Sequence, residues 1–141
     1  MLSIDNKISY NEIMDKKIFK AYDIRGIYPK EINEKIVSEI IAAVVKNFKP
    51  KKIIVGHDAR LSSPKLYRAA INSIKHQAAS SKLIKIRIAT TPMLYFLTNH
   101  FNADLGIMIT ASHNPKQYNG LKIVGKNAIP ISGKQIWKII L

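Results

Sequence analysis

Residues 105–115 read LGIMITASHNP, an apolar run that passes into a polar turn. The run from Leu105 to Ile109 has the length and composition of a buried strand, and Asn114-Pro115 is a pair typical of turns. Ser112 lies between the two. Open α/β sheets bind ligands in the crevice beyond the carboxyl ends of their strands, so a serine at this place is a candidate nucleophile. Serine and asparagine also make turns and helix caps without any function, and the run alone leaves that interpretation open.

Around this run, strand-like and helix-like segments alternate along the chain. From Glu31 to Phe48, apolar residues recur at spacings of three and four, which predicts one face of a helix. Pro64, directly after two serines, predicts the first turn of another helix. The alternation predicts an α/β fold with a largely parallel sheet. The expected elements are a helix over 31–48, a strand over 52–56, a helix from 62 to about 79, a strand over 82–88, a helix beginning at 91, a strand over 105–109, and a terminal hairpin of 121–124 with 128–131.

Lys122 is the second chemically interesting residue near the serine. The preceding pair Asn119-Gly120 predicts a turn that returns this lysine toward the end of the sheet where Ser112 lies. No acidic residue follows Asp104, so we expect nothing nearby to neutralise the lysine. An ammonium group near a hydroxyl fits phosphoryl transfer, which depends mostly on positioning and electrostatics. Serine hydrolysis is disfavoured, because the G-x-S-x-G elbow is absent and a histidine follows the serine directly.

The composition restricts the class of protein further. With 141 residues, 47% of them hydrophobic, the chain is long enough for one core but not for two. No apolar run reaches the roughly 20 residues of a membrane helix, and residues 1–17 lack the apolar centre of a signal peptide, so we expect a cytoplasmic protein without a membrane segment. The absence of cysteine excludes disulfides and thiolate metal sites. The net charge of +14 is scattered from Lys7 to Lys138 without a defined footprint, so nucleic acid is not an expected partner.

Four segments, all in the expected order, resemble the α-D-phosphohexomutases, the phosphomannomutase and phosphoglucomutase family. The resemblance covers residues 19–124, and four ordered matches are far more specific than one. The segments are 19–26 (FKAYDIRG), similar to the family's amino-terminal signature; 55–64 (VGHDARLSSP), similar to its second strand and turn; 90–96 (TTPMLYF), similar to a helix start; and 110–122, where TASHNP and YNGLK resemble the active-site serine loop.

The resemblance implies a fold and a set of boundaries. The expected fold is a three-layer αβα domain with a mixed, largely parallel sheet, as in the first domain of the family. It implies an amino-terminal extension over 1–18, this domain over 19–132, and the start of a helix toward an absent second domain over 133–141. The family's D-G-D-x-D-R metal loop, its G-E-x-S-G-H sugar loop and its phosphate-binding loop do not occur in the chain. We therefore expect an incomplete protein that is inactive alone.

The resemblance also implies a reaction. Ser112 would be phosphorylated and would donate its phosphoryl group to a hexose phosphate, giving a bisphosphate intermediate that turns over and returns a phosphate. The expected substrate is a hexose phosphate, with a hexose 1,6-bisphosphate as activator. Mg²⁺ is the expected cofactor, and Ser112 would join it only through its phosphate, since the aspartate ligands belong to the absent loop.

The neighbouring residues receive roles from the same resemblance. Arg25 and Lys122 would lie against the transferring phosphoryl group, the first as a planar fork and the second as a point charge. Tyr22 would orient the sugar or the arginine. His113 would shape the serine loop, although a general acid/base role stays open. Asn114 would tie the turn through side-chain hydrogen bonds.

Some positions depart from the family pattern, and two other functions stay open. Residues 77–85 lack the usual glycine-containing turn, so the strand there is expected to be altered. His57 stands where the family more often has arginine, which makes the surroundings of Asp58 less certain. One alternative function is a fragment complemented by a separate chain, which predicts an exposed apolar surface over 137–141. The other is a basic module for nucleic acid or polyphosphate. The chain does not distinguish mannose from glucose as the sugar.

Overall fold

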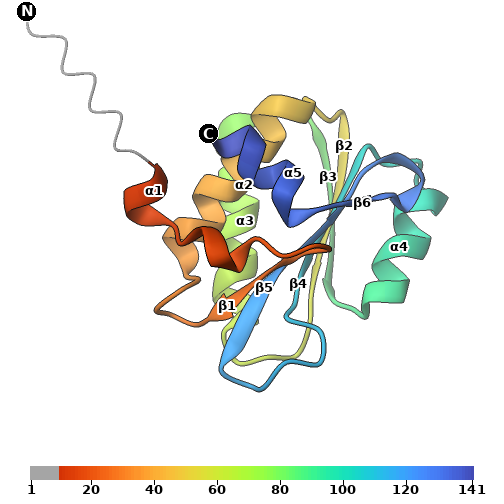
Figure 1. The fold of residues 1–141 in the computed structure, drawn as a ribbon. Helices are drawn as coiled ribbons and strands as arrows, with labels where there is room; N and C mark the ends of the chain where they lie inside the picture. The colour runs from red at the N-terminus through yellow and green to blue at the C-terminus, as the bar shows by residue number, and fades with distance from the viewer. Residues whose placement is uncertain (1–9) are drawn as a thin grey trace, which may run out of the picture.

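A mixed six-stranded sheet with helices on both faces forms the centre of the computed structural model, which describes residues 10–141 (Figure 1). The strand order is β1-β5-β4-β2-β3, and β6 also pairs with β5. The strands β2, β3 and β4 are parallel, whereas β5 is antiparallel to β1, β4 and β6. The elements are α1 (Tyr10–Ile13), β1 (Ile24–Ile27), α2 (Glu34–Phe48), β2 (Lys52–His57), α3 (Ser63–Gln77), β3 (Lys82–Ile88), α4 (Thr91–His100), β4 (Leu105–Ile109), β5 (Tyr118–Val124), β6 (Pro130–Ile131) and α5 (Gly133–Ile140), with short 3-10 helices η1 (Lys16–Ile18) and η2 (Lys126–Ala128).

The helices form two layers around this sheet. Helices α2, α3 and α5 cover one face and α4 covers the other, as Figure 1 shows. The predicted three-layer α/β fold with a mixed sheet is therefore confirmed. The predicted hairpin is also present, because β5 and β6 pair antiparallel with Ile123 opposite Ile131.

Helix α2 illustrates how the sequence pattern builds the larger core. The side-chain oxygen of Asn33 accepts a hydrogen bond from the backbone N–H of Ile36 at 3.0 Å, which caps the first turn. The helix ends at Lys49, whose φ of 48° lies in the left-handed region. Burying one isoleucine of its apolar face contributes about 1.5–3 kcal/mol. The buried residues of that face are Ile36, Val37, Ile40, Ile41, Val44 and Val45.

The prediction of a turn at Asn119-Gly120 is wrong. Both residues lie inside β5, where Gly120 is opposite Arg25 of β1. A Cβ atom on Gly120 would overlap the carbonyl oxygen of Ile24. The glycine therefore permits a close approach of two strands instead of a reversal, and the chain turns earlier, within the loop that carries the serine.

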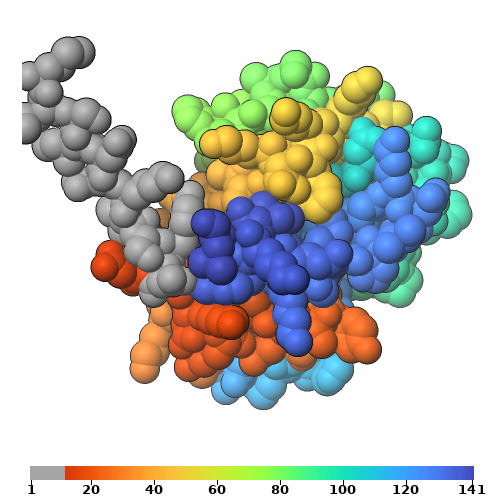
Figure 2. Space-filling view, turned by 45° about the horizontal axis from the view of Figure 1, so that its top comes forward, coloured from red at the N-terminus to blue at the C-terminus, as the bar shows by residue number. Residues whose placement is uncertain are grey.

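Helix α5 packs onto the core instead of presenting an apolar surface. Ile136 and Ile140 are buried, and Trp137 is 8% exposed with its ring centroid 4.9 Å from that of Phe19. Figure 2 shows the helix between α2 and the residues that lead into β1. The predicted exposed apolar surface over 137–141 is thus wrong except at Leu141, because the apolar side of the helix already has a partner.

The strand expected to be altered, β3, is present as an edge strand with one irregularity. Its pairing with β2 shifts register between Val55 and Gly56, and Arg87 at the shift has a positive φ of 57°. This is the signature of a bulge, which bends an edge strand away from regular pairing.

The smaller helical layer leaves part of the sheet to polar residues. Helix α4 packs on β2 and β4, where Leu94 joins Ile54 and Met108 in a second small core. Met108 is opposite Lys122 of β5, so both side chains point to this face. Arg25 points the same way, because its partner Gly120 lies two residues from Lys122. The same face thus carries apolar side chains under α4 and charged ones toward β1.

Candidate functional site

Ser112 lies in a tight turn directly after β4. The backbone N–H of Asn114 donates to the carbonyl of Ala111 at 3.1 Å, and the N–H of Ser112 donates to Oγ1 of Thr110 at 3.0 Å. Ser112 has a positive φ of 55°, a region that favours glycine. A strained backbone held in place by its surroundings is typical of functional sites. The structure thus gives Ser112 a fixed, partly exposed position beyond the carboxyl end of β4.

The segment 111–118, here called the serine loop, is held by hydrogen bonds from the side chain of Arg60. The guanidinium donates to the carbonyl oxygens of Ser112 at 2.8 Å and Asn114 at 2.7 Å through Nη2. Through Nη1 it donates to those of Pro115 at 2.7 Å and Tyr118 at 3.1 Å. The sequence alone gives no role to Arg60, although it belongs to the segment HDARLSSP. Nothing in that segment alone reveals a bond to a loop more than fifty positions away.

Asp58 holds this arginine in turn. The backbone N–H of Asp58 donates to the carbonyl of Ile109 at 3.0 Å, which ties the end of β2 to that of β4. Its carboxylate accepts from Nε of Arg60 at 3.2 Å and from Oγ of Ser63 at 2.5 Å. Asn119, fully buried, donates to Ser63 as well, at 3.0 Å. The loop after β2, the start of α3 and the start of β5 are therefore one connected hydrogen-bond network.

Asp23, Arg25 and Lys122 form a charged group beside the serine loop. Asp23 is only 3% exposed, and its two carboxylate oxygens meet Nε of Arg25 at 2.8 Å and Nζ of Lys122 at 3.3 Å. The expectation that nothing neutralises Lys122 is wrong, because pairing of β1 with β5 brings an acid from the other end of the chain to it. Two cations against one anion leave this group with one positive charge in excess, which suits an anionic ligand.

Asn114 connects the charged group to the serine loop. Its Oδ1 accepts from Nη1 of Arg25 at 2.7 Å, across 89 positions of sequence. The bonds to Asp23 and Asn114 use two of the five N–H groups of the guanidinium. Arg25 therefore keeps N–H donors that these two hydrogen bonds do not use.

The remaining predicted residues lie at the surface of this region. Tyr22 is 78% exposed, so it is not a core aromatic, and it directly precedes Asp23. His113 is exposed on the serine loop. Their predicted roles, the orientation of a sugar and the shaping of the loop, stay predictions, as does a general acid/base role for His113.

His57 has a structural role in the described part of the chain. It is 7% exposed, its Nδ1 lies 2.7 Å from the carbonyl oxygen of Asp58, and its ring centroid is 4.7 Å from that of Tyr67. The ring therefore fills the space between β2 and α3, just before the network around Asp58.

A shallow hollow of about 400 Å³ opens beside the serine loop, lined by Asp58, Ala59, Arg60, Ser112, Asn114 and Lys116. Its acidic side chain is already engaged by Arg60 and Ser63. Over residues 10–141, no three His, Asp or Glu side chains gather as metal ligands would. The described residues therefore do not by themselves offer a donor set for Mg²⁺.

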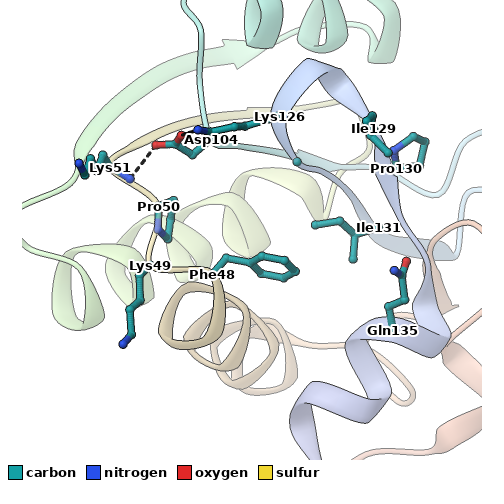
Figure 3. Close-up of a pocket in the computed structure, with 11 residues that line it drawn as sticks. Phe48, Lys49, Pro50, Lys51, Asp104, Lys126, Ile129, Pro130, Ile131 and Gln135 are labelled. Carbon is teal, nitrogen blue, oxygen red and sulfur yellow. Dashed lines mark hydrogen bonds and ion pairs between the residues drawn. The ribbon is translucent and has the colours of Figure 1, made fainter.

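A second hollow of about 550 Å³ lies at the opposite end of the sheet (Figure 3). Phe48 and Ile131 line it on the apolar side, and Asp104 lies at its rim. The carboxylate of Asp104 accepts from the backbone N–H groups of Lys51 at 2.8 Å and of Lys52 at 3.1 Å, and pairs with Lys126 at 3.4 Å. Burial by itself raises the pKa of Asp104. The two backbone hydrogen bonds and the pairing with Lys126 outweigh burial, so the pKa is lowered overall. Asp104 thus holds the start of β2 in place, and its role here is structural.

Comparisons with known proteins find relatives that match most of the chain. The sequence profile described as phosphoglucomutase/phosphomannomutase, alpha/beta/alpha domain I, matches residues 16–140. The chain is 46% identical over 115 residues to a phosphomannomutase of Escherichia coli, covering 82% of this chain and 25% of that protein. It is 42% identical over 118 residues to a phosphomannomutase of Methanocaldococcus jannaschii, covering 84% and 25%. It thus spans about a quarter of the length of these relatives.

The solved structures give the same result for the fold. The crystal structure of a phosphoglucomutase/phosphomannomutase family protein from Burkholderia thailandensis superposes with a TM-score of 0.77 at 30% identity. The match covers 89% of this chain and 29% of that one. Among the helices of residues 10–141, none is long and apolar enough to cross a bilayer.

Proposed function

Because the chain belongs to the phosphoglucomutase/phosphomannomutase family, as its α/β/α domain I, we propose that it carries the phosphoryl group of a hexose phosphate mutase on Ser112. The observation that carries the proposal is the joining of two features by Asn114. One is a serine held at a positive φ beyond the end of β4. The other is the charged group of Asp23, Arg25 and Lys122, which has one positive charge in excess. The bond from Arg25 to Asn114 links them.

The transfer itself is a displacement at phosphorus. In the forward half, the bond between phosphorus and Oγ of phosphorylated Ser112 breaks while a hydroxyl oxygen of the hexose phosphate bonds to phosphorus; the hydroxyl loses its proton and the departing Oγ takes one up. The product is a hexose bisphosphate and a free serine. In the return half, Oγ loses its proton and bonds to the phosphorus of the other phosphate, the bond from that phosphorus to the sugar oxygen breaks, and the sugar oxygen takes up a proton. The net result is a moved phosphate and a regenerated phosphoserine.

The residues of this chain supply position and charge. The Arg25 guanidinium has donors to spare for the phosphoryl oxygens, and the Lys122 ammonium adds a point charge. Asp23 pairs with both cations, one through each carboxylate oxygen, which keeps them in place before substrate arrives. Tyr22 is exposed beside this group, which supports its proposed contact with the sugar. His113, exposed next to Ser112, is proposed to shape the loop.

Complete turnover is proposed to require more than these residues. The chain spans about a quarter of the relatives' length, and its described residues offer no Mg²⁺ donor set. Phosphorylated Ser112 would help to hold a Mg²⁺ through its phosphate, and the other ligands would come from parts of the family that this chain does not match. Bound there, the ion would clamp the charge of the transferring group.

Phosphorylation of Ser112 is the direct test. The purified chain is incubated with Mg²⁺ and a hexose 1,6-bisphosphate, and intact mass with peptide mapping reports any added phosphoryl group. We expect the label on Ser112, and none on a Ser112→Ala variant. A wild-type chain that takes no label, alone or mixed with the parts of a family relative that this chain does not match, would refute the proposal. A coupled mutase assay on the same samples tells whether the chain turns over by itself.

A further inference from the structure

Arg60 is the most heavily engaged side chain in the candidate site. Its guanidinium has five N–H groups, and they meet five acceptors: one oxygen of Asp58 and the four carbonyls of the serine loop. The side chain is 13% exposed. The loop therefore closes over a single, partly buried cation.

This saturation separates Arg60 from Arg25, the arginine proposed to contact the phosphoryl group. Arg25 uses two of its donors in the bonds to Asp23 and Asn114. To bind Arg60, a phosphate would first have to displace carbonyl oxygens of the loop. Arg25 can donate to a phosphate without losing a bond that it already makes. Arg60 thus acts on the loop and not on a ligand.

Arg60 fixes two residues that matter for the chemistry. Nη2 bonds the carbonyl of Ser112 at 2.8 Å, while Thr110 holds the N–H of the same residue at 3.0 Å. Both sides of the strained Ser112 backbone are therefore tied, which sets the direction of its Cα–Cβ bond. Nη2 also bonds the carbonyl of Asn114 at 2.7 Å, and the side chain of Asn114 accepts from Arg25. One side chain thus controls the position of the serine relative to the cationic pair.

We propose that Arg60 is the positioning residue of the serine loop, which holds Ser112 at its positive φ and in register with Arg25. The inference rests on the proposed function for its catalytic consequence, but its structural content stands on the contacts alone. The role requires a guanidinium. A lysine ammonium carries the same charge but has three donors on one atom, too few and too close together for four carbonyls and a carboxylate.

The experiment compares Arg60→Ala and Arg60→Lys with wild type, and uses Arg68→Ala, an exposed arginine of α3, as the matched control. The first readout is the amide NMR signals of Ser112 and Asn114, with the φ-dependent coupling of Ser112. The second readout is the rate of Ser112 phosphorylation by a hexose 1,6-bisphosphate with Mg²⁺. Both are repeated with added methylguanidinium or methylammonium.

We expect Arg60→Ala to move both amide signals, to change the Ser112 coupling, and to slow phosphorylation by about 100-fold, the scale of a misplaced reacting group. Methylguanidinium should restore signals and rate, and methylammonium should restore neither. Arg60→Lys should stay folded and show the same losses, which keeps the test valid if Arg60→Ala fails to fold. The Arg68→Ala variant should match wild type.

Two results would overturn the inference. One is a folded Arg60 variant whose Ser112 signals and coupling equal those of wild type. The other is equal rescue by methylammonium, which would mean that a positive charge suffices and the planar guanidinium is not required. If wild type takes no phosphoryl group, either alone or mixed with the parts of a family relative that this chain does not match, the proposed function fails, while the NMR readout still decides the role of Arg60.

Discussion

At the scale of single residues, Ser112 occupies a backbone position that suits glycine better than serine. Its φ of 55° costs a residue with a Cβ atom about 1 kcal/mol, and the surrounding bonds hold it there. Strain of this kind is tolerated where a reactive side chain must be presented. The stability of the loop and its chemistry are therefore expected to oppose each other.

Replacement of Ser112 measures how much the positive φ costs in stability. We expect Ser112→Gly to be more stable than Ser112→Ala by about 0.5–1 kcal/mol, because glycine adopts the positive φ without strain. Neither variant should accept a phosphoryl group. Urea unfolding of both variants, followed by circular dichroism, gives the difference in the free energy of unfolding.

A second strained position serves as the control. Ala128 in η2 has a φ of 55° and lies far along the chain from the serine loop. Ala128→Gly should also raise the free energy of unfolding by about 0.5–1 kcal/mol while leaving Ser112 phosphorylation unchanged. If Ser112→Gly is no more stable than Ser112→Ala while Ala128→Gly gains stability, the strain at Ser112 is not real.

Asp104 gives a prediction for acid pH. The contacts in the folded state lower the pKa of this carboxyl below its unfolded value of 3.8. The ionised group therefore stabilises the fold above this value, and the stabilisation is lost as the pH falls through the lowered pKa. We expect the wild-type chain to lose more stability between about pH 5 and pH 3 than an Asp104→Asn variant, since the unfolded form takes up its proton first. Melting temperatures across this range measure the effect, and equal slopes for the two chains would count against it.

At the scale of elements, the pairing of β1 with β5 decides whether the charged group exists. Gly120 lets the two strands approach, because any Cβ there would overlap the backbone of Ile24. Asp23 and Arg25 come from one strand region and Lys122 from the other, so separation of the strands would dismantle the ion pairs.

Gly120→Ala is therefore expected to be costly. Overlap with a neighbouring backbone should lower the free energy of unfolding by about 1–3 kcal/mol. Gly125→Ala is the matched control, because the nearest atoms to its added Cβ lie 3.9 Å away and its change should stay within about 0.5 kcal/mol. Chemical denaturation of both variants decides the matter, and similar stabilities would show that the strands adjust without cost.

At the scale of the whole molecule, the net charge of +14 acts on the stability of the fold. Scattered like charges repel one another in the compact state, and salt screens them. We expect the melting temperature to rise between about 0.02 M and about 0.3 M NaCl, since the Debye length shortens over this range. A gain of about 1 kcal/mol corresponds to roughly 4 °C for a domain of this size. A melting temperature that is constant or falls over this range would mean that local ion pairs outweigh the repulsion.

The sequence by itself determined the elements and the position of the serine. Apolar spacing predicted α2, the run from Leu105 predicted β4, and Thr-Pro and Ser-Pro pairs predicted the starts of helices. These features depend on neighbouring residues, whose side-chain periodicity is visible in any short window. The serine loop and its family were recognised for the same reason, because the motif is contiguous.

Only the tertiary structure decided how the site is held together. The partner of Lys122 is Asp23, the glycine at 120 lies in a strand, and Arg60 carries the serine loop through bonds to residues 52 to 58 positions away. Each of these facts depends on which strands pair and in which register. Register is fixed by burial of the whole sheet between its helices, a property shared by distant residues and not encoded in any one segment.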